Sequence, residues 1–107
     1  MAGENVITLT DANFAAETKK GVVLVDAWAP WCGPCRMLGP VVEALADEMK
    51  GKVKVGKLNV DENSGVAEKL EVSSIPALFL FRDGKMVANR VGAATKESLK
   101  EWLNSNL

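Results

Sequence analysis

The stretch Val22-Val23-Leu24-Val25-Asp26-Ala27-Trp28, followed closely by Trp31-Cys32-Gly33-Pro34-Cys35, decides how this chain folds. The first part is an apolar run that only Asp26 interrupts, and such runs are typical of central strands covered on both faces. After the second part, from about residue 34 to 50, apolar residues recur with the period of an amphipathic helix. The pentapeptide holds the chain's only two cysteines. A Cys-x-x-Cys spacing between a strand and a helix indicates a redox motif.

The pentapeptide also places its cysteines at different depths in the expected helix. A cysteine at a helix N-terminus meets unpaired N–H groups and the positive end of the helix dipole, and both favour its thiolate. Cys32 is therefore the candidate attacking sulfur and Cys35, one turn further in, the candidate resolving sulfur. Pro34 suits the first helical turn, where its missing N–H costs nothing.

Two other interpretations of the cysteine pair stay open at this point. The pair could form a structural disulfide, although secreted domains that depend on structural disulfides usually contain more cysteines. It could be half of a zinc site, which needs about four ligands. The chain has no histidine and no third cysteine, so carboxylates or a second subunit would have to supply the other ligands. A redox-active pair is the favoured interpretation.

Composition narrows the class of protein. The chain has 107 residues, of which 48% are hydrophobic, and we expect one globular domain spanning residues 1–107. A net charge of −1 indicates no general attraction to nucleic acid or to a membrane surface. The absence of histidine excludes Ser–His and Cys–His catalysis. No apolar segment approaches the ~18 residues of a membrane span, and the start lacks a signal-peptide pattern. The prediction is a cytoplasmic protein.

Strands and helices are expected to alternate along the chain. The pattern predicts strands over residues 6–9, 22–28, 53–60, 77–81 and 86–91. It predicts helices that start at Thr10-Asp11, near Pro34, at Asp61-Glu62-Asn63 and at Thr95. Residues expected on the buried faces of these helices include Phe14, Ala15, Met37, Leu38, Val41, Val42, Leu45, Met49, Val66, Ala67, Leu70, Leu99, Trp102, Leu103 and Leu107.

The order of these elements predicts an α/β fold. Two strands joined by a helix favour parallel pairing with a right-handed crossover. Asp83-Gly84 is typical of a two-residue hairpin turn and predicts an antiparallel pair at the end of the sheet. Pro40 falls inside the helical pattern and is expected to kink the helix without ending it. The result is a mixed sheet packed between layers of helices.

The chain resembles the thioredoxin family. Asp26-Ala27-Trp28-Ala29-Pro30-Trp31-Cys32-Gly33-Pro34-Cys35-Arg36 is similar to the active-site signature of that family. Further matches are Lys57, Asp61, Ile75-Pro76, Asp83-Gly84 and Gly92. The similarity runs from about Val6 to Leu107. It implies a central mixed sheet of about five strands flanked by four helices, and a cis peptide bond between Ile75 and Pro76 that faces the disulfide.

The resemblance also implies an activity. Members reduce protein disulfides by dithiol–disulfide exchange, with the roles suggested above for Cys32 and Cys35, and so maintain cell redox homeostasis. Gly33 and Pro34 would tune the redox properties of the pair. The family carries electrons in the cysteines and needs no bound cofactor. Expected partners are a thioredoxin reductase and disulfide-containing proteins such as ribonucleotide reductase, peroxiredoxin and methionine sulfoxide reductase. The protein is expected to be a monomer.

Asp26 and Lys57 are the candidate proton-handling residues. A carboxyl in a covered strand loses hydration, so its pKa is expected to rise. The resemblance implies that Asp26 takes the proton of Cys35 during resolution and that Lys57 is its matching cation on the next strand. The alternatives are a hydrogen-bonded core or strand-edge aspartate, and a solvated lysine at a strand end.

The surroundings of the cysteines are expected to bind the substrate. Trp31 is predicted to be an exposed docking residue, while Trp28 is expected to pack inside. Gly33, Ile75, Pro76 and Gly92 resemble the family's flat, uncharged platform, where backbone groups can pair with an extended peptide. For Gly92 the alternative is an ordinary loop glycine.

Two rival functions remain from the sequence. The protein could work in the opposite direction, as a disulfide oxidase or isomerase, but Pro34 stands where such enzymes often have histidine. It could also be a binding module in which the cysteines are incidental. The chain departs from the family pattern at Ser74 and Ala77, on the implied docking rim, so partner preference is left open by the sequence.

Overall fold

Five strands and four helices alternate along the chain of this computed structural model, which describes residues 4–107. The strands are β1 (Val6–Leu9), β2 (Val22–Trp28), β3 (Lys54–Asn59), β4 (Ala77–Arg82) and β5 (Lys85–Val91). The helices are α1 (Phe14–Thr18), α2 (Gly33–Glu48), α3 (Ser64–Lys69) and α4 (Lys96–Ser105). The predicted α/β class and element order are confirmed.

The sheet has the order β1-β3-β2-β4-β5, with β2 at its centre. β2 pairs in parallel with β3 and antiparallel with β4. Asp83 and Gly84 form the β4–β5 turn with φ values of +51° and +88°, the positive angles that a two-residue hairpin of this hand requires. This turn is fastened to the start of β2, because the Gly21 N–H donates to the Asp83 carboxylate over 2.8 Å.

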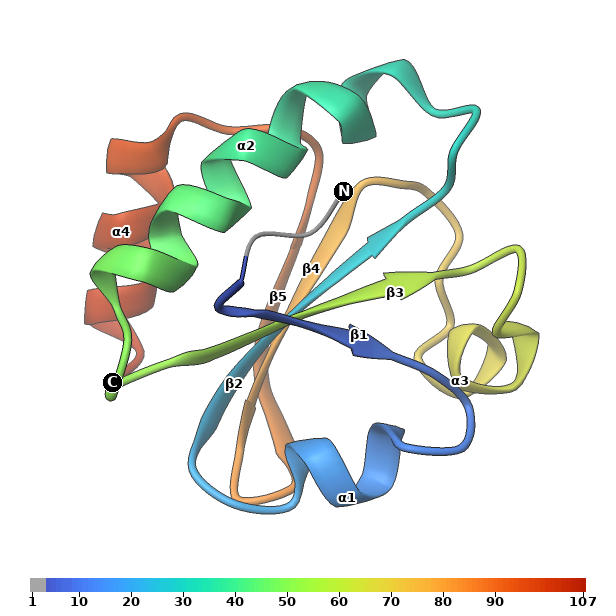
Figure 1. Cartoon of the computed structure of the whole chain (residues 1–107), viewed down its shortest axis with the longest axis horizontal. Coiled ribbons are helices and arrows are strands. Elements are labelled where there is room, and N and C mark those ends of the chain that lie inside the picture. The colour runs from blue at the N-terminus through green and yellow to red at the C-terminus, as the bar shows by residue number, and fades with distance from the viewer. Residues whose placement is uncertain (1–3) are drawn as a thin grey trace.

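Helices cover both faces of the sheet (Figure 1). α2 and α4 pack on one face, where Leu24, Leu45, Leu78, Leu99 and Leu103 belong to one buried cluster. α1 and α3 pack on the other face over a second cluster that includes Leu9, Val25, Leu58, Val66 and Phe79. Burying each such side chain stabilises the fold by about 1.5–3 kcal/mol. β2 supplies residues to both clusters, as its nearly continuous apolar run predicts.

The first helix begins later than predicted. Its N-cap is Asn13, not Thr10-Asp11, because the Thr10 hydroxyl and carbonyl oxygens instead close the preceding turn, accepting from the Asn13 and Phe14 N–H groups. Ala15, predicted to face inward, is exposed. The Asp11 side chain caps a different helix: its carboxylate accepts from the Gly65 and Val66 N–H groups at the start of α3, over 3.2 and 2.8 Å.

Besides Ala15, two residues expected on buried helix faces are exposed. Met37 is 75% exposed, although it fits the apolar period of α2. Leu107 is 49% exposed and lies past Ser105, where α4 ends. Pro40 is accommodated within α2, which continues to Glu48, as predicted.

Two further features concern the backbone near the cysteines and the length of the helices. The peptide bond between Ile75 and Pro76 is cis, as the family resemblance implied. Within residues 4–107, none of the helices combines the length and apolar character needed to cross a membrane.

Candidate active site

Cys32 and Cys35 lie where the central strand passes into the helix that covers it. Cys32 is the N-cap residue of α2, with extended backbone angles, and Cys35 lies in the first turn of that helix. The two sulfurs form a disulfide with their Cα atoms 5.2 Å apart, so the structure describes the oxidised protein. The Cys35 N–H donates to the Cys32 sulfur over 3.2 Å. The strand, motif and helix inferred from the sequence therefore meet as predicted.

The start of α2 provides a positive electrostatic environment for Cys32. The first turn contains no acidic residue, and the free N–H groups and dipole of the helix favour an anion at its N-terminus. Pro34 occupies this turn without leaving a donor unpaired. In the reduced protein the thiolate of Cys32 is the sulfur that this environment stabilises.

The two sulfurs differ in what surrounds them, although each cysteine is only 4% exposed. Cys35 lines a cavity of about 640 Å³ together with Lys57, Gly39, Glu43 and other residues, and Cys32 is not part of that lining. Cys32 directly follows Trp31, which is 67% exposed. Cys32 thus follows an exposed residue in the chain, and Cys35 borders a partly open cavity that contains the charged side chains of Lys57 and Glu43.

An apolar rim surrounds the disulfide. The half-buried Ile75 packs against the two cysteines. Pro76 is buried, and its carbonyl oxygen accepts from the Gly92 N–H over 2.8 Å, which joins two separate loops. Gly92 has a φ of +100°, a conformation that favours glycine. The predicted platform residues are therefore near one another, with Gly92 using its N–H inside the protein.

Trp31 is the most exposed tryptophan on this rim. Its indole N–H donates to the Asp61 carboxylate over 2.9 Å, which fixes the ring while leaving its face open. The predicted exposure of Trp31 is confirmed. Trp28, by contrast, packs partly buried against the disulfide cluster, as expected. Ala77 is 2% exposed and belongs to the core, so it does not lie on the docking rim as the sequence suggested.

Asp26 is a buried carboxyl that forms no hydrogen bond with the described residues. The residue is 1% exposed, and among residues 4–107 neither of its carboxylate oxygens has a partner. Loss of hydration raises its pKa from 3.8 to about 6, and the nearby charge of Lys57 opposes the rise. The rise predicted from its place in the covered strand is confirmed. Within residues 4–107, no protein group forms the hydrogen bond that the alternative for Asp26 would require.

Lys57 lies opposite Asp26 in the parallel register of β2 and β3, as its assignment to the neighbouring strand predicted. Its ammonium group lies beside α2, where a Cβ atom at Gly39 would be 3.3 Å from it. There it lies 3.9 Å from the Glu43 carboxylate and 5.5 Å from the centre of the Trp28 ring. Its side chain is 15% exposed, so the alternative of a solvated lysine is wrong.

Two residues of the site, Gly39 and Glu43, were missed by sequence reasoning, and both border Lys57. Asp61 was noted as a family match, but its role in anchoring Trp31 was not predicted. Cys35, Gly39 and Glu43 are spaced four residues apart, which places them in one row along α2. That spacing is a signal visible in the sequence, whereas the pairing of Asp61 with Trp31 depends on how two loops meet.

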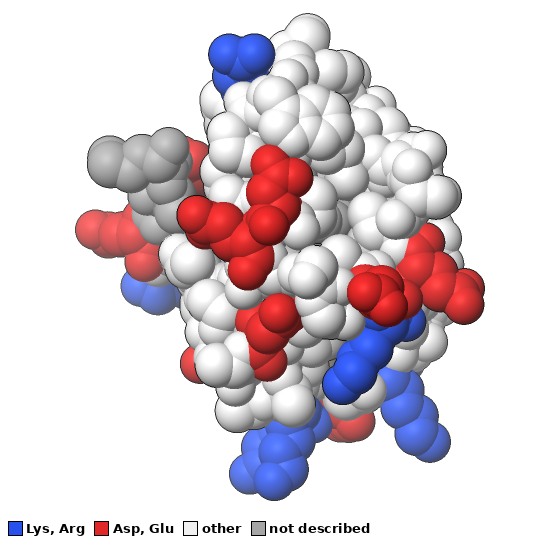
Figure 2. All heavy atoms as spheres, turned by 90° about the vertical axis from the view of Figure 1, so that its right-hand side faces the viewer, with Lys and Arg blue, Asp and Glu red and all other residues white. Residues whose placement is uncertain are grey.

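Charged side chains are unevenly distributed on the face toward which β2 and β3 run. Figure 2 shows acidic groups across the middle of this face and most of the basic groups along its lower edge, with a broad uncharged area between and above them. The uncharged area is the kind of surface on which an extended peptide can lie without displacing a tightly hydrated charge.

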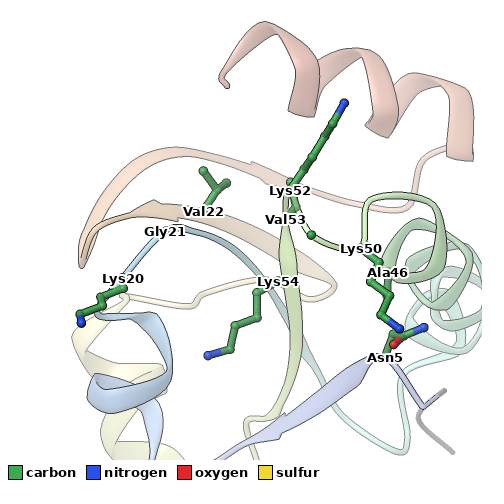
Figure 3. A pocket seen from close by; sticks show the side chains of 10 residues that line it. Asn5, Lys20, Gly21, Val22, Ala46, Lys50, Lys52, Val53 and Lys54 are labelled. Atoms are coloured by element: carbon green, nitrogen blue, oxygen red, sulfur yellow. The ribbon is translucent and has the colours of Figure 1, made fainter.

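A second hollow, of about 350 Å³, lies at the opposite ends of β2 and β3. Its lining includes Lys20, Lys50, Lys52 and Lys54. Figure 3 shows these side chains pointing in different directions, so their ammonium groups do not converge on one point. Lys54 is paired with Glu17 at 2.6 Å. This hollow is separate from the disulfide.

A disulfide at the N-terminus of a helix, beside a surface tryptophan, is the site of a thiol–disulfide oxidoreductase. The thioredoxin family model matches residues 5–105. The chain belongs to the thioredoxin family, so the resemblance seen in the sequence is confirmed. Its members are protein-disulfide reductases, and this protein is one.

Bacterial relatives agree with the family model over nearly the whole chain. The thioredoxin of Bacillus subtilis is 50% identical over 102 residues, covering 95% of this chain and 98% of the relative. The thioredoxin of Pseudomonas aeruginosa is 46% identical over 106 residues, with 97% and 98% covered. A thioredoxin of Staphylococcus aureus is 49% identical over 102 residues, with 95% and 98% covered.

Proposed function

We propose that this protein reduces disulfide bonds in other proteins, with Cys32 as the attacking sulfur and Cys35 as the resolving sulfur. The observation that carries the assignment is the difference in their surroundings: Cys32 caps α2 next to the exposed Trp31, while Cys35 lies one turn further into the helix and lines the cavity that contains Lys57. A target disulfide approaching from the surface meets Cys32 first. The helix N-terminus also stabilises the Cys32 thiolate.

The reaction consists of two exchanges. The Cys32 thiolate attacks one sulfur of the target disulfide, forms a mixed disulfide and releases the other target sulfur as a thiolate, which takes up a proton. Cys35 then loses its proton and attacks the Cys32 sulfur. The mixed disulfide breaks, the second target sulfur leaves, and the Cys32–Cys35 disulfide forms. The target gains two electrons and two protons, and the dithiol loses the same.

Asp26 is proposed to accept the Cys35 proton during the second exchange. Its pKa of about 6 means that it is mostly ionised at neutral pH yet able to hold a proton transiently. The pKa of a useful general base lies near the working pH. Lys57, on the adjacent strand, is proposed to stabilise the ionised form of Asp26 before it takes the proton.

We propose that the remaining predicted site residues tune the redox properties of the cysteine pair and position the target protein. Gly33 and Pro34 keep the first turn of α2 small and uncharged, which sets the stability of the reduced pair. Trp31, Ile75, Pro76 and Gly92 surround the disulfide, and we propose that an extended segment of the target lies across them. Trp31 is exposed next to Cys32 in the chain, and the half-buried Ile75 packs against the cysteines, so both can provide apolar contact.

The proposed partners follow from the same chemistry. A dithiol that becomes oxidised in each cycle needs an electron donor, for which we propose a thioredoxin reductase. The proposed acceptors are ribonucleotide reductase, peroxiredoxin and methionine sulfoxide reductase, each of which forms a disulfide during its reaction. We propose that the protein acts as a monomeric single domain in the cytoplasm, where thiols are kept reduced, without a bound cofactor or nucleic acid.

Trapping experiments test the cysteine roles. Cys35→Ser should accumulate mixed disulfides with target proteins through Cys32, because the first exchange proceeds and the second does not. Cys32→Ser should accumulate no mixed disulfide of comparable stability. Trapping mainly through Cys35 in the Cys32→Ser protein would reverse the assignment.

Insulin reduction tests the direction of the reaction. The wild-type protein should accelerate precipitation of insulin chains by dithiothreitol, and a thioredoxin reductase with NADPH should replace dithiothreitol as the donor. A reduction potential as oxidising as that of disulfide-forming enzymes would favour the oxidase or isomerase alternative. Full function after both cysteines are changed to Ser would favour the binding module.

A further inference from the structure

Lys57 lies between two carboxyl groups and pairs with only one of them. Asp26 lies opposite it across β2 and β3, yet among residues 4–107 the ion pair of Lys57 is with Glu43 on α2, at 3.9 Å. Asp26 keeps two unpartnered oxygens in a fully covered position. An unpartnered buried carboxyl next to a lysine that pairs elsewhere is costly, so the arrangement needs a physical cause.

The geometry of α2 supplies that cause. A Cβ atom at Gly39 would lie 3.3 Å from the Lys57 ammonium nitrogen, so this glycine leaves the space into which the ammonium fits. Glu43 lies four residues further along the same row of the helix, and its side chain is 30% exposed. Along this row, Gly39 leaves room for the ammonium group and Glu43 provides a carboxylate that attracts it. Lys57 therefore lies against the helix.

The other groups around Lys57 do not compete for it. The Trp28 ring lies 5.5 Å from its ammonium group, a distance at which a cation is attracted to the ring face. Arg36 and Glu62 line the same cavity. Arg36 carries the same charge as Lys57, and within residues 4–107 Glu62 forms no ion pair with it. The strand on the other side of β2 places only apolar residues, Ala77 to Phe81, opposite Asp26 and its neighbours.

We propose that Glu43 is a positioning residue for the resolving exchange: its carboxylate holds the Lys57 ammonium against α2 and away from Asp26. This inference rests on the proposed role of Asp26 as proton acceptor. With Lys57 held by Glu43, the charged form of Asp26 receives less stabilisation than a direct ion pair would give. Asp26 therefore keeps enough proton affinity to take the Cys35 proton at neutral pH.

A titration of Asp26 tests the inference without reference to activity. In the oxidised protein, the carboxyl ¹³C shift of Asp26 is followed against pH in the wild type, Glu43→Gln and Glu48→Gln. Removing the Glu43 charge frees Lys57 to pair with Asp26, so Glu43→Gln should lower the pKa of Asp26 by about one, the low end of the effect of a close cation on a carboxyl. Glu48→Gln is the matched control on the same helix, because Glu48 pairs with Lys96 and Lys100 at the far end of α2.

A second background separates positioning from simple charge repulsion. In a Lys57→Met protein there is no ammonium to reposition, so adding Glu43→Gln should change the pKa of Asp26 much less than it does in the wild type. An unchanged Asp26 pKa in Glu43→Gln would overturn the inference. An equal fall in the wild-type and Lys57→Met backgrounds would overturn it too, since the effect would then not pass through Lys57.

The resolving exchange gives the functional readout. If Asp26 accepts the Cys35 proton, the pH at which resolution reaches half its maximal rate should fall in Glu43→Gln along with the pKa of Asp26. Glu43→Asp keeps the charge and should restore part of the wild-type profile. A lower Asp26 pKa with an unmoved pH profile would leave the positioning role of Glu43 intact and refute the proposed role of Asp26.

Discussion

Replacing Asp26 by alanine should make the oxidised protein more stable at neutral and alkaline pH but not in acid. Burial raises the pKa of Asp26 from 3.8 to about 6. Between these values the folded state binds more protons than the unfolded state, so stability falls as pH rises. The loss begins near pH 4 and is complete above the folded pKa, by about pH 7. Asp26→Ala removes this loss.

The size of the effect follows from the two pKa values. The gap between 3.8 and about 6 corresponds to about 3 kcal/mol, because each pKa unit is worth ~1.4 kcal/mol. The exposed fraction of Asp26 is only 1%, so solvent screens little of this energy. Replacing the carboxyl by a methyl group also changes packing, but that contribution does not depend on pH. The difference in unfolding free energy between the two proteins should therefore rise by about 3 kcal/mol from pH 3 to pH 8.

Denaturant titrations of both oxidised proteins across this pH range measure the difference. The disulfide removes the cysteines as titrating groups, and every other group contributes almost equally to both proteins. Asp26→Asn is a matched variant, since it keeps the volume of the side chain and removes only the charge. It should show the same dependence on pH. Parallel stability curves for wild type and Asp26→Ala would refute the desolvation argument.

The same substitution should slow resolution of the mixed disulfide. Cys35 loses its proposed proton acceptor, and a positioned general base typically contributes on the order of 100-fold or more. Single-turnover reduction of a disulfide substrate at pH 7 measures this step. If Asp26→Ala is less stable than the wild type at high pH and resolves the mixed disulfide at the normal rate, then Asp26 is a structural residue. Gain of stability with loss of rate is the trade expected at an active site.

Three further substitutions test other parts of the structure. Pro34→His should raise the reduction potential measured against glutathione by about 30 mV or more, which is equivalent to ~1.4 kcal/mol. The reason is that an imidazolium near Cys32 stabilises the thiolate and hence the reduced form. An unchanged potential would contradict this electrostatic argument. Gly56→Ala should lower the unfolding free energy by about 1–3 kcal/mol, because the new Cβ would lie 2.6 Å from the buried Leu9 side chain. Unchanged stability in a denaturant titration would show that Leu9 can move aside. Asp11→Ala should cost about 1 kcal/mol by uncapping α3, whereas Asp11→Asn, which keeps an acceptor, should cost less in the same titration.

The sequence by itself determined the features that depend on neighbouring residues. The apolar run Val22–Trp28 became the central strand, and Asp83-Gly84 became the hairpin turn. Thr95 caps the last helix, its hydroxyl oxygen accepting from the Ser98 N–H over 3.1 Å. The Cys-x-x-Cys spacing was enough to predict the redox site, because two cysteines separated by two residues at a helix start can reach each other without help from distant parts of the chain.

Tertiary structure decided the pairings between distant elements. Asp11 precedes one helix in the sequence but caps another, because folding brings Gly65 and Val66 to it from more than fifty positions away. Met37 fits the apolar stripe of α2 yet is exposed, since periodicity shows which residues share a face and not whether another element covers it.

The partner of Lys57 was decided in the same way. Strand order made Asp26 the expected partner, and the register does bring the two residues together. The helix that crosses above them offers the ammonium group an opening at Gly39 and a carboxylate at Glu43, and Lys57 pairs there. A flexible four-carbon side chain can reach either carboxyl, so the choice depends on the three-dimensional distances among charges, which no local pattern in the sequence contains.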